Sequence, residues 1–463
     1  MKKKVLILEP RGVEANVYDQ YMSLPLMGPI YLGSILEQKG FEVRIFNENL
    51  VGRDISLPEL DADFLLVSGL SCTIERGYDL AAMFKRRNPG GKVIVGGPHV
   101  SFMQEEAACF ADHVVVGEGE EVIADLLRHG SDSVVVQGVS PRNLDALPLP
   151  NYRLLVGFER MKRIPIITSR GCPFDCEFCS VTKMFGRKYR MSSVERVLEE
   201  LRLVGDVEVF FSDDNFTASP KHTHALLDEM GRRNIRPRQW STQVRADVAR
   251  DKDLVRKLRR LGCTRLYVGF ESVSQRTLNA MNKKQNVDEM IHAIETFHAF
   301  GIRVHGMFIL GNDGEDDDSV RETLQFINRH GIDSVQFMII TPFPGTDTFA
   351  RMEREGRIMH HLWRYYDAMH VVFRPRDASP IQVQNRMLRA YREFYSARGA
   401  LGVAAKAILQ NLQTAGDASK RFLLRPTRMN AAIRLGGRFV LKKWKESNRE
   451  YLEYLQQVSM ATG

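Results

Sequence analysis

The chain has 463 residues, 44% of them hydrophobic and 26% charged, which is ordinary for a globular protein and allows two or three domains. No apolar run approaches the roughly 20 residues of a membrane-spanning helix, and the start MKKKVLILEP is typical of a first strand and not of a signal peptide. The six cysteines are unevenly spread and suggest no disulfide framework, so we expect the protein to reside in a reducing cytoplasm. The whole net charge of +8 arises in residues 381–463, which contain 15 Lys and Arg but only 5 Asp and Glu.

The first 135 residues alternate short apolar runs with helical patterns, which predicts a parallel sheet covered on both faces. We expect strands within residues 4–10, 41–47, 63–71, 92–98 and 112–120, and helices near 29–40, 75–87 and 119–128. The fold class predicted for residues 1–135 is therefore a doubly wound α/β domain of the Rossmann or flavodoxin-like type. Ligands of such domains bind beyond the carboxyl ends of the strands.

Three of the loops expected at those strand ends are small and rich in glycine. They contain Ser68, Gly69 and Ser71; Gly96, Gly97, Pro98 and His99; and Gly117, Glu118 and Gly119. Glycine allows a bulky ligand to approach the backbone closely, but it is also typical of tight turns between strand and helix. The glycine content alone leaves both interpretations open.

A second alternation follows a proline-bearing linker, which we place at residues 136–160. Six expected strands alternate with helical patterns at 192–204, 220–233, 251–261, 286–300 and 317–330. This pattern predicts a partial (β/α)6 barrel over residues 161–350, with its active site at the carboxyl ends of the strands. Residues 351–463 are predicted to be a basic helical region.

Three cysteines, Cys172, Cys176 and Cys179, follow the first barrel strand with the spacing C-x3-C-x2-C in RGCPFDCEFCS. They could be incidental, or they could bind zinc, which requires a fourth ligand such as the distant Cys263, His222 or His224. A [4Fe–4S] cluster normally takes four thiolates. Three thiolates leave one iron open to an outside ligand, and we favour this last interpretation.

This cysteine motif closely resembles that of the radical S-adenosylmethionine (SAM) superfamily, over roughly residues 160–350. The resemblance implies a [4Fe–4S] cluster whose open iron is chelated by SAM. It also implies that Phe178 lies against the cofactor. Further cofactor-binding positions suggested by the resemblance are Asp213, Asp214 and Asn215 near the SAM amino group, Arg245 for the carboxylate, Glu271 for the ribose, and Ile309 and Gly311 near the adenine.

The parallel α/β domain ahead of the barrel, together with its three glycine loops, resembles the cobalamin-dependent branch of that superfamily. The resemblance implies a bound cobalamin. The D-x-H-x-x-G motif, whose His ligates cobalt in many cobalamin proteins, is replaced by EPRGVEAN, and His99 is the first histidine of the chain. Methylthiotransferases have three more cluster cysteines in this domain, whereas this chain has only Cys72 and Cys109 there, and we expect Cys72 to line the pocket.

The resemblance implies methylation of an unactivated carbon by way of a 5′-deoxyadenosyl radical, with a second SAM remethylating the cobalamin. It also implies an external one-electron reductant of the flavodoxin or ferredoxin type, and a small-molecule or lipid substrate. Two alternatives remain: a radical cyclisation or rearrangement that uses cobalamin without methyl transfer, and a corrinoid or iron–sulfur sensor that does not turn over.

The basic tail, with Lys and Arg alternating with Leu, Phe, Trp and Tyr, has three interpretations. It could be a solvated lid that packs on the barrel, a peripheral membrane-surface helix, or a nucleic-acid contact. Nucleic acid ranks last because no RNA-binding motif accompanies the charge.

Overall fold

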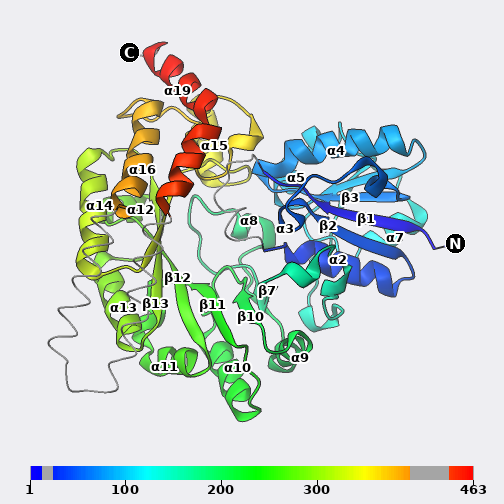
Figure 1. Ribbon diagram of the computed structural model, residues 1–463, viewed down its shortest axis with the longest axis horizontal. Coiled ribbons are helices and arrows are strands. Elements are labelled where there is room, and N and C mark those ends of the chain that lie inside the picture. Colours follow the sequence, from blue (N-terminus) through cyan, green and yellow to red (C-terminus); the bar gives the residue numbers. More distant parts are fainter. Residues whose placement is uncertain (1, 13–23, 397–436, 462–463) are drawn as a thin grey trace. The chain divides into compact units, whose positions relative to one another are not determined.

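The computed structural model describes residues 2–12, 24–396 and 437–461 of the chain (Figure 1). It forms two compact units. Unit 1 consists of Met1–Trp240, Pro342–Arg351 and His361–Asp367, and unit 2 consists of Ser241–Thr341, Met352–His360 and Ala368–Gly463.

The amino-terminal part of unit 1 is a six-stranded parallel sheet with the order β2-β1-β3-β4-β5-β6. Its strands are β1 (Lys4–Glu9), β2 (Glu42–Asn47), β3 (Phe64–Ser68), β4 (Lys92–Gly96), β5 (His113–Val116) and β6 (Val135–Gln137). Because β1 pairs with β2 on one side and β3 on the other, the strand order reverses at β1/β3. A ligand crevice is expected beyond the carboxyl ends at this point.

Helices cover both faces of this sheet, which confirms the doubly wound architecture. Figure 1 shows α2 (Met27–Gln38) and α4 (Ile74–Arg87) on opposite faces, and α7 (Ile123–His129) contacts α2. The shorter helices are α3 (Glu48–Val51), α5 (Pro98–Phe102) and α6 (Gln104–Ala107). Apolar side chains of β1, β2 and β3 pack against α2 in one core, for example Ile7, Ile45 and Leu66 against Ile30.

The segment after β5 is more ordered than a bare linker. The short strand β6, which the sequence analysis did not predict, adds a sixth strand to the sheet, and short 3-10 turns follow at Leu144–Ala146, Tyr152–Leu154 and Phe158–Arg160. The Tyr152 hydroxyl is buried 2.8 Å from Glu200 Oε1 and 2.7 Å from the Pro165 carbonyl oxygen. This contact fixes the segment within unit 1.

The second large sheet has the order β14-β13-β12-β11-β10-β7, and its recorded pairs β7–β10, β12–β13 and β13–β14 are parallel. Its strands are β7 (Arg163–Ile166), β10 (Glu208–Phe211), β11 (Gln239–Val244), β12 (Cys263–Glu271), β13 (Arg303–Leu310) and β14 (Ser334–Ile339). Its helices are α9 (Val194–Val204), α10 (Pro220–Arg232), α11 (Lys252–Arg260), α12 (Gln275–Ala280), α13 (Val287–Ala299) and α14 (Asp317–His330). Six strands alternating with helices confirm the partial barrel.

A small antiparallel ribbon brackets the cysteine loop. Strand β8 (Ser169–Arg170) pairs with β9 (Arg190–Met191), and the loop between them contains the three cysteines and helix α8 (Val181–Phe185). The sequence analysis missed this ribbon because a two-residue strand has no periodic pattern. The ribbon holds the two ends of the loop together.

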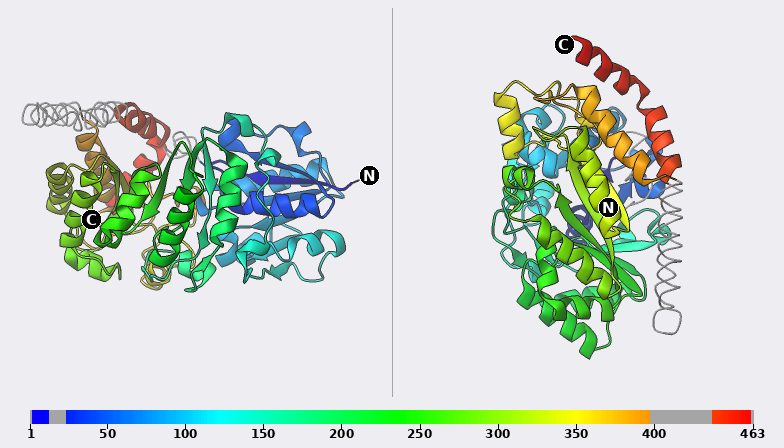
Figure 2. Two further views of the ribbon diagram at one scale, coloured as in Figure 1. Left: turned by 90° about the horizontal axis from the view of Figure 1, so that it is seen from below. Right: turned by 90° about the vertical axis from the view of Figure 1, so that its left-hand side faces the viewer.

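The described carboxyl-terminal residues belong to unit 2 and pack on it. Helix α16 (Pro380–Phe394) lies beside the last helix, whose final segment is α19 (Arg449–Ala461) (Figure 2). The last helix buries one stripe formed by Trp444, Asn448, Tyr451 and Leu455. Tail helices expected within residues 397–436 lie outside the described residues, and no helix in the described part of the chain is both long and apolar enough to cross a membrane.

Candidate active site

The three predicted cluster cysteines lie together in one half-exposed loop of unit 1. A turn closes the loop, since the Cys179 amide donates to the Cys176 carbonyl oxygen over 3.1 Å. Burial, with smaller contributions from the nearby Cys176 and Cys172, raises the pKa of the Cys179 thiol to about 12. The three sulfurs are therefore close enough to interact electrostatically.

The arrangement fits an iron–sulfur cluster better than a zinc ion. Among the described residues, no group of three or more His, Cys, Asp or Glu side chains has the geometry to hold one metal ion. A cubane cluster distributes its thiolates over separate irons, so its ligands do not converge on one point. Cys263, proposed as an alternative zinc ligand, is fully buried, and its S–H donates to the Arg265 carbonyl oxygen at 3.7 Å.

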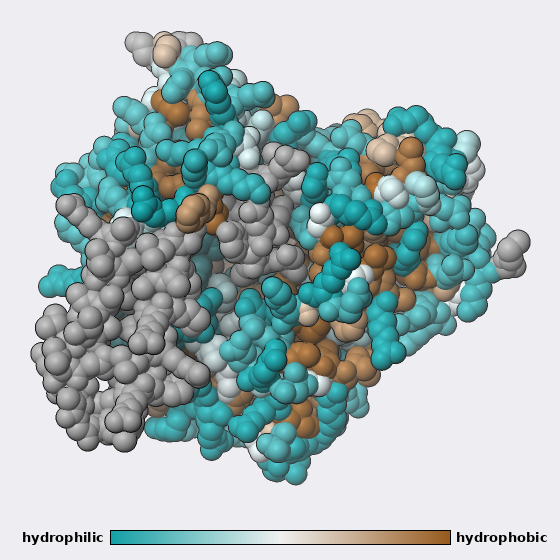
Figure 3. Space-filling model, viewed as in Figure 1, coloured by the Kyte–Doolittle hydropathy of each residue, from teal (hydrophilic) through white to brown (hydrophobic). Residues whose placement is uncertain are grey.

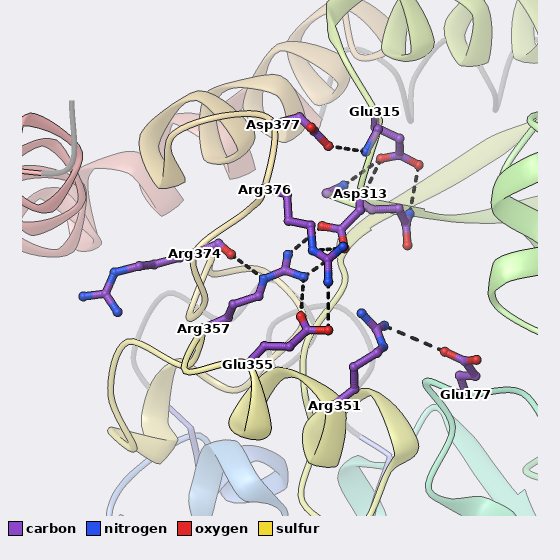
Figure 4. Close-up of polar contacts among 12 residues, drawn as sticks. Glu177, Asp313, Glu315, Arg351, Glu355, Arg357, Arg374, Arg376 and Asp377 are labelled. Atoms are coloured by element: carbon purple, nitrogen blue, oxygen red, sulfur yellow. Dashed lines mark hydrogen bonds and ion pairs between the residues drawn. The ribbon is translucent and has the colours of Figure 1, made fainter.

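A segment following β14 braces the cysteine loop within unit 1. The Thr348 amide donates to the Glu177 carbonyl oxygen over 3.2 Å, and Arg351 lies 3.8 Å from the Glu177 carboxylate (Figure 4). Lys183, in α8, pairs with Asp347 at 2.8 Å. These contacts flank Phe178 in the sequence, and Phe178 itself is half-buried.

The predicted SAM-amino segment follows β10, but its side chains differ in their roles. Asp213 is fully buried and accepts hydrogen bonds from the hydroxyl (2.9 Å) and amide (3.3 Å) of Thr168, and burial raises the pKa of Asp213 to about 6. Asn215 is also buried, and its carbonyl oxygen accepts from the Tyr189 hydroxyl at 3.1 Å. Asp214 is exposed and raises the pKa of Cys179 electrostatically, so it lies near that thiol.

Unit 1 contains a cavity of about 480 Å³ at the β1/β3 switch point. It is lined by residues of three strand-end loops, including Glu9, Ser68, Ser71, Cys72, Pro98 and His99. Ser180, the residue after Cys179, lines the same cavity. One cavity therefore extends from the glycine loops to the cysteine loop, and Cys72 lines it as expected.

The glycines of these loops shape the cavity wall by close backbone packing. Gly97 has a φ of +101°, and a Cβ placed on it would lie 2.9 Å from the Gly69 carbonyl oxygen. The Gly69 amide donates to the Gly96 carbonyl oxygen over 3.2 Å. Any larger residue at position 97 would be strained and would force the two loops apart, so glycine allows the close packing of the loops that form the cavity wall.

His99 lies at the cavity wall at the centre of a buried network. Its Nδ1 lies 3.1 Å from the Ser71 hydroxyl, and its Nε2 lies 3.5 Å from Glu106 Oε1. Glu106 also accepts hydrogen bonds from Tyr78 at 3.1 Å and from Trp363 Nε1 at 2.7 Å. The Nδ1 contact with Ser71 orients the imidazole, whereas the buried Nε2 forms no hydrogen bond with the described residues.

Glu9 is a cavity residue that the sequence analysis did not single out. Its Oε2 accepts from the Leu26 amide at 2.9 Å and from Asn47 Nδ2 at 3.0 Å, whereas its buried Oε1 has no hydrogen-bond partner among the described residues. Burial raises the pKa of Glu9 to about 8, so the acid is largely protonated at neutral pH. An acidic residue ending the apolar strand KVLILE is the signal that could have identified it.

The remaining loop, after β5, does not contribute a side chain to the cavity. The Glu118 carboxylate is buried and pairs with Arg170 and Arg190. The amide of the preceding residue, Gly117, donates to the Ser101 hydroxyl at 2.9 Å. Glu118 thus joins protein loops to one another, although we predicted that it contacts the cofactor.

In unit 2, the predicted ribose residue Glu271 forms a buried ion pair that the sequence analysis missed. Lys283 Nζ lies 2.7 Å from Glu271 Oε1, and both residues are 5% exposed. A Cβ on Gly269 would lie 2.5 Å from that same oxygen, so glycine makes room for the pair. Arg245 donates to the Lys284 carbonyl oxygen at 3.1 Å, which places it beside the same segment.

The predicted adenine segment after β13 is fixed by ionic and amide contacts of unit 2. Ile309 is buried, and Gly311 has a φ of +90° with its amide donating to Glu315 at 2.8 Å. Arg357 binds the Asp313 carboxylate through both terminal nitrogens, at 2.6 and 2.9 Å (Figure 4). The loop backbone is therefore held rigidly.

Comparisons with known proteins match both halves of this arrangement. The Radical SAM superfamily model matches residues 166–327, and the B12 binding domain model matches residues 21–127. An uncharacterized methyltransferase of Pyrococcus horikoshii is 30% identical over 80% of this chain and 88% of its own length. The chain belongs to the cobalamin-dependent radical SAM enzymes.

Two further similarities support this family assignment. The bacteriochlorophyllide d C-12(1)-methyltransferase of Chlorobaculum tepidum is 27% identical over 85% of this chain and 88% of its own length. The structure of the radical SAM methyltransferase TsrM from Kitasatospora setae, with cobalamin and a [4Fe–4S] cluster bound, has a TM-score of 0.63 at 17% identity and covers 77% of this chain and 78% of its own. Both sequence relatives are named methyltransferases, and the solved structure shares the fold of this chain.

The cofactors of this radical SAM enzyme are accordingly a [4Fe–4S] cluster, SAM and cobalamin. The thiol loop and the glycine-walled cavity of unit 1 fit the cluster and the corrinoid, respectively. Bound there, these cofactors supply radical and methyl-transfer chemistry that amino-acid side chains lack.

Replacing any one of Cys172, Cys176 and Cys179 by alanine should remove a cluster ligand. We expect loss of most bound iron and sulfide after anaerobic reconstitution, and 5′-deoxyadenosine formation at background level. Iron and sulfide analysis together with chromatography of SAM products measures both. Cys109→Ala, which changes an exposed cysteine of unit 1, is the control and should behave as wild type. Retained SAM cleavage in a cluster-loop variant would contradict the assignment.

The buried acid Glu9 predicts a pH dependence of stability. Its pKa is about 8 in the folded protein and ordinarily about 4.5, so the unfolded chain releases the proton first. The stabilising contribution is full below pH 4.5 and declines as pH rises towards 8, by up to about 1.4 kcal/mol per pH unit. Glu9→Gln should therefore show a smaller fall in Tm between pH 6 and 8 than wild type, measured by circular dichroism.

The exposed carboxylate Glu121 provides the control for this measurement, because Glu121→Gln should retain the wild-type fall in Tm. If Glu9→Gln retained it as well, Glu9 would not be the buried acid responsible.

Proposed function

We propose that this enzyme methylates an unactivated carbon of an apolar small molecule or lipid. The observation that carries the proposal is the cavity of unit 1, which is lined both by the glycine loops and by Ser180 beside the third cysteine. A methyl donor bound at the loops and a radical generated at the cysteines would share this cavity. The named substrate of the Chlorobaculum relative, a bacteriochlorophyllide, supports a large ring-bearing substrate.

The cavity loops are the proposed cobalamin contacts. We assign direct contact to Ser68, Ser71, Pro98 and His99, which line the cavity, and a backbone role to Gly69, Gly96, Gly97, Gly117 and Gly119. The unpartnered Oε1 of Glu9 suits a hydrogen bond to an amide group of the corrinoid.

The SAM contacts are proposed from chemistry as well as from the family pattern. In unit 1 the exposed Asp214 suits the amino group, with the buried Asp213 and Asn215 supporting its loop, and Phe178 suits an apolar contact. In unit 2 we propose Arg245 for the carboxylate, Glu271 for the ribose hydroxyls, and the rigid backbone at Ile309 and Gly311 for the adenine. The ion pair with Lys283 orients the Glu271 carboxylate.

SAM products test the proposed reaction. The protein is first reconstituted anaerobically with the cluster and cobalamin. It is then incubated with SAM that has a trideuterated methyl group, with a flavodoxin or ferredoxin reducing system as the proposed electron donor, and with extracts of lipids or small metabolites. We expect 5′-deoxyadenosine and S-adenosylhomocysteine in equal amounts and a trideuteromethylated product by mass spectrometry. A wild-type protein that made only 5′-deoxyadenosine and a rearranged product would instead be a cyclase or mutase. If the protein formed neither 5′-deoxyadenosine nor S-adenosylhomocysteine, it would be a sensor.

We also propose that the enzyme is cytoplasmic and touches an anionic membrane surface through its last helix. Residues 437–449 contain five basic residues and one acidic residue. Trp444 is buried against His370, whereas Phe439 is 79% exposed and lies near exposed Lys442 and Lys443. Most of the described surface in Figure 3 is hydrophilic with scattered apolar patches, so an exposed Phe beside lysines is notable.

Vesicle binding tests this contact. The wild-type protein should sediment with vesicles of phosphatidylcholine and phosphatidylglycerol but not with vesicles of phosphatidylcholine alone. A triple variant with Phe439→Ser, Lys442→Glu and Lys443→Glu should lose most of the binding, because it lacks both the apolar anchor and the charge attraction. Arg256→Glu, an exposed basic residue of helix α11, serves as the matched control and should bind normally. Equal binding by all three proteins would contradict the proposal.

A further inference from the structure

The cysteine loop of unit 1 is closed at both ends by arginines that share one carboxylate. Arg170, two residues before Cys172, lies in β8, and Arg190 lies opposite it in β9. Both contact the Glu118 carboxylate: Arg170 Nη1 lies 2.5 Å from Oε2, and Arg190 Nη2 contacts Oε1. Arg170 also binds Glu120 Oε1 at 2.6 Å. We call Glu118, Glu120, Arg170 and Arg190 the arginine clamp.

The clamp is buried and balanced in charge. The four side chains are at most 8% exposed, and two positive charges meet two negative ones. Burial opposes ionisation of Glu118, but hydrogen bonds from Arg190, Ser140 and Arg170 hold the pKa of Glu118 below its usual value. The contacts of Glu120 and Glu118 likewise raise the pKa of Arg170 despite its burial. Glu118 and Arg170 therefore remain ionised.

Further contacts fix the orientation of each guanidinium group. Arg190 Nη1 donates to the Pro141 carbonyl oxygen over 2.9 Å, and the Arg170 guanidinium lies 5.5 Å from the ring centre of Tyr31. Buried ion pairs of this kind add little net stability compared with well-packed apolar residues. What they add is geometric specificity, since bidentate guanidinium contacts tolerate few orientations.

The clamp also connects the cysteines to the proposed cobalamin cavity by a short path. Glu118 follows Gly117, whose amide donates to the Ser101 hydroxyl at 2.9 Å, and that hydroxyl donates to the Gly97 carbonyl oxygen at 2.9 Å. Gly97 precedes Pro98 and His99 in the cavity wall. A single line of polar contacts thus runs from Arg170 to the cavity.

From this geometry we infer that Glu118, Arg170 and Arg190 are positioning residues that fix the cluster loop against the cobalamin loops. Radical formation and methyl transfer require the two cofactors at a fixed separation, because misplacement by about 1 Å can cost about 100-fold in rate. The clamp supplies that constraint without touching either cofactor. The inference rests on the proposed cobalamin site and deepens it.

The test compares Glu118→Gln and Arg190→Lys with wild type, each reconstituted with cluster and cobalamin. Glu118→Gln keeps the shape of the side chain and removes its charge. Arg190→Lys keeps the positive charge and removes the bidentate guanidinium group. The control is Glu200→Gln, a buried glutamate of unit 1 whose carboxylate accepts from Tyr152 instead. Iron and cobalamin content and the Tm establish that each protein is folded and loaded.

The decisive readout is the magnetic interaction between cob(II)alamin and the reduced cluster, measured by electron paramagnetic resonance. This readout requires no methyl acceptor, so it is independent of the substrate and of the methylation proposal. We expect both clamp variants to retain both cofactors but to show a broadened distribution of the interaction. We also expect several-fold more 5′-deoxyadenosine per S-adenosylhomocysteine. The control should match wild type in both respects.

An unchanged interaction and an unchanged product ratio in a folded, fully loaded clamp variant would overturn the inference. Loss of cobalamin with the cluster retained would also overturn it, because Glu118 would then be a binding residue. If Glu118→Gln does not fold, Arg190→Lys gives the same readouts.

Discussion

Parallel strand pairing is the constraint on which the arrangement of this enzyme depends. In each large sheet the recorded pairs are parallel, so the connections after the strands emerge at one edge. Glu9, Ser68 and Gly96 end three neighbouring strands and so come to one place, although they are far apart in the sequence. The cysteines follow β7 and the short β8 for the same reason. The residues proposed to bind the cofactors thus lie at the carboxyl ends of the strands, whereas the strands themselves form the apolar core.

Buried polar groups give these strand ends their individual roles. Asp213 supports the strand beside the cysteines, His99 is held between Ser71 and Glu106, and Glu118 joins two loops through arginines. Each of these groups is buried and contacts protein partners, which makes its position specific. In the cavity wall, Glu9 Oε1 and His99 Nε2 are buried without a hydrogen-bond partner among the described residues. Because His99 Nε2 still lies 3.5 Å from the Glu106 carboxylate, Glu9 is the side chain better suited to a ligand.

The basic tail shows how one helix can separate structural and surface roles. Trp444, Asn448, Tyr451 and Leu455 recur at helical spacing and face the rest of unit 2, where Asn448 Oδ1 lies 2.8 Å from His370 Nε2 and the Tyr451 hydroxyl donates to the Val371 carbonyl oxygen over 2.8 Å. The neighbouring Lys442, Lys443 and Lys445 are exposed. Charge alone would not distinguish a packed helix from a free one, whereas the stripe of buried aromatic residues does.

The sequence by itself determined the fold class, the six barrel strands and the three cluster cysteines. Apolar periodicity and cysteine spacing are local patterns, so they can be recognised without coordinates. Only the tertiary structure decided which polar residues pair with one another. The pairing of Lys283 with Glu271, the sharing of Glu118 by two arginines, and the placement of Glu9 in the cavity all join residues that are distant in the chain or unremarkable in pattern. Contacts of this kind depend on how strands pack and how charges are compensated after burial, and no local spacing encodes them.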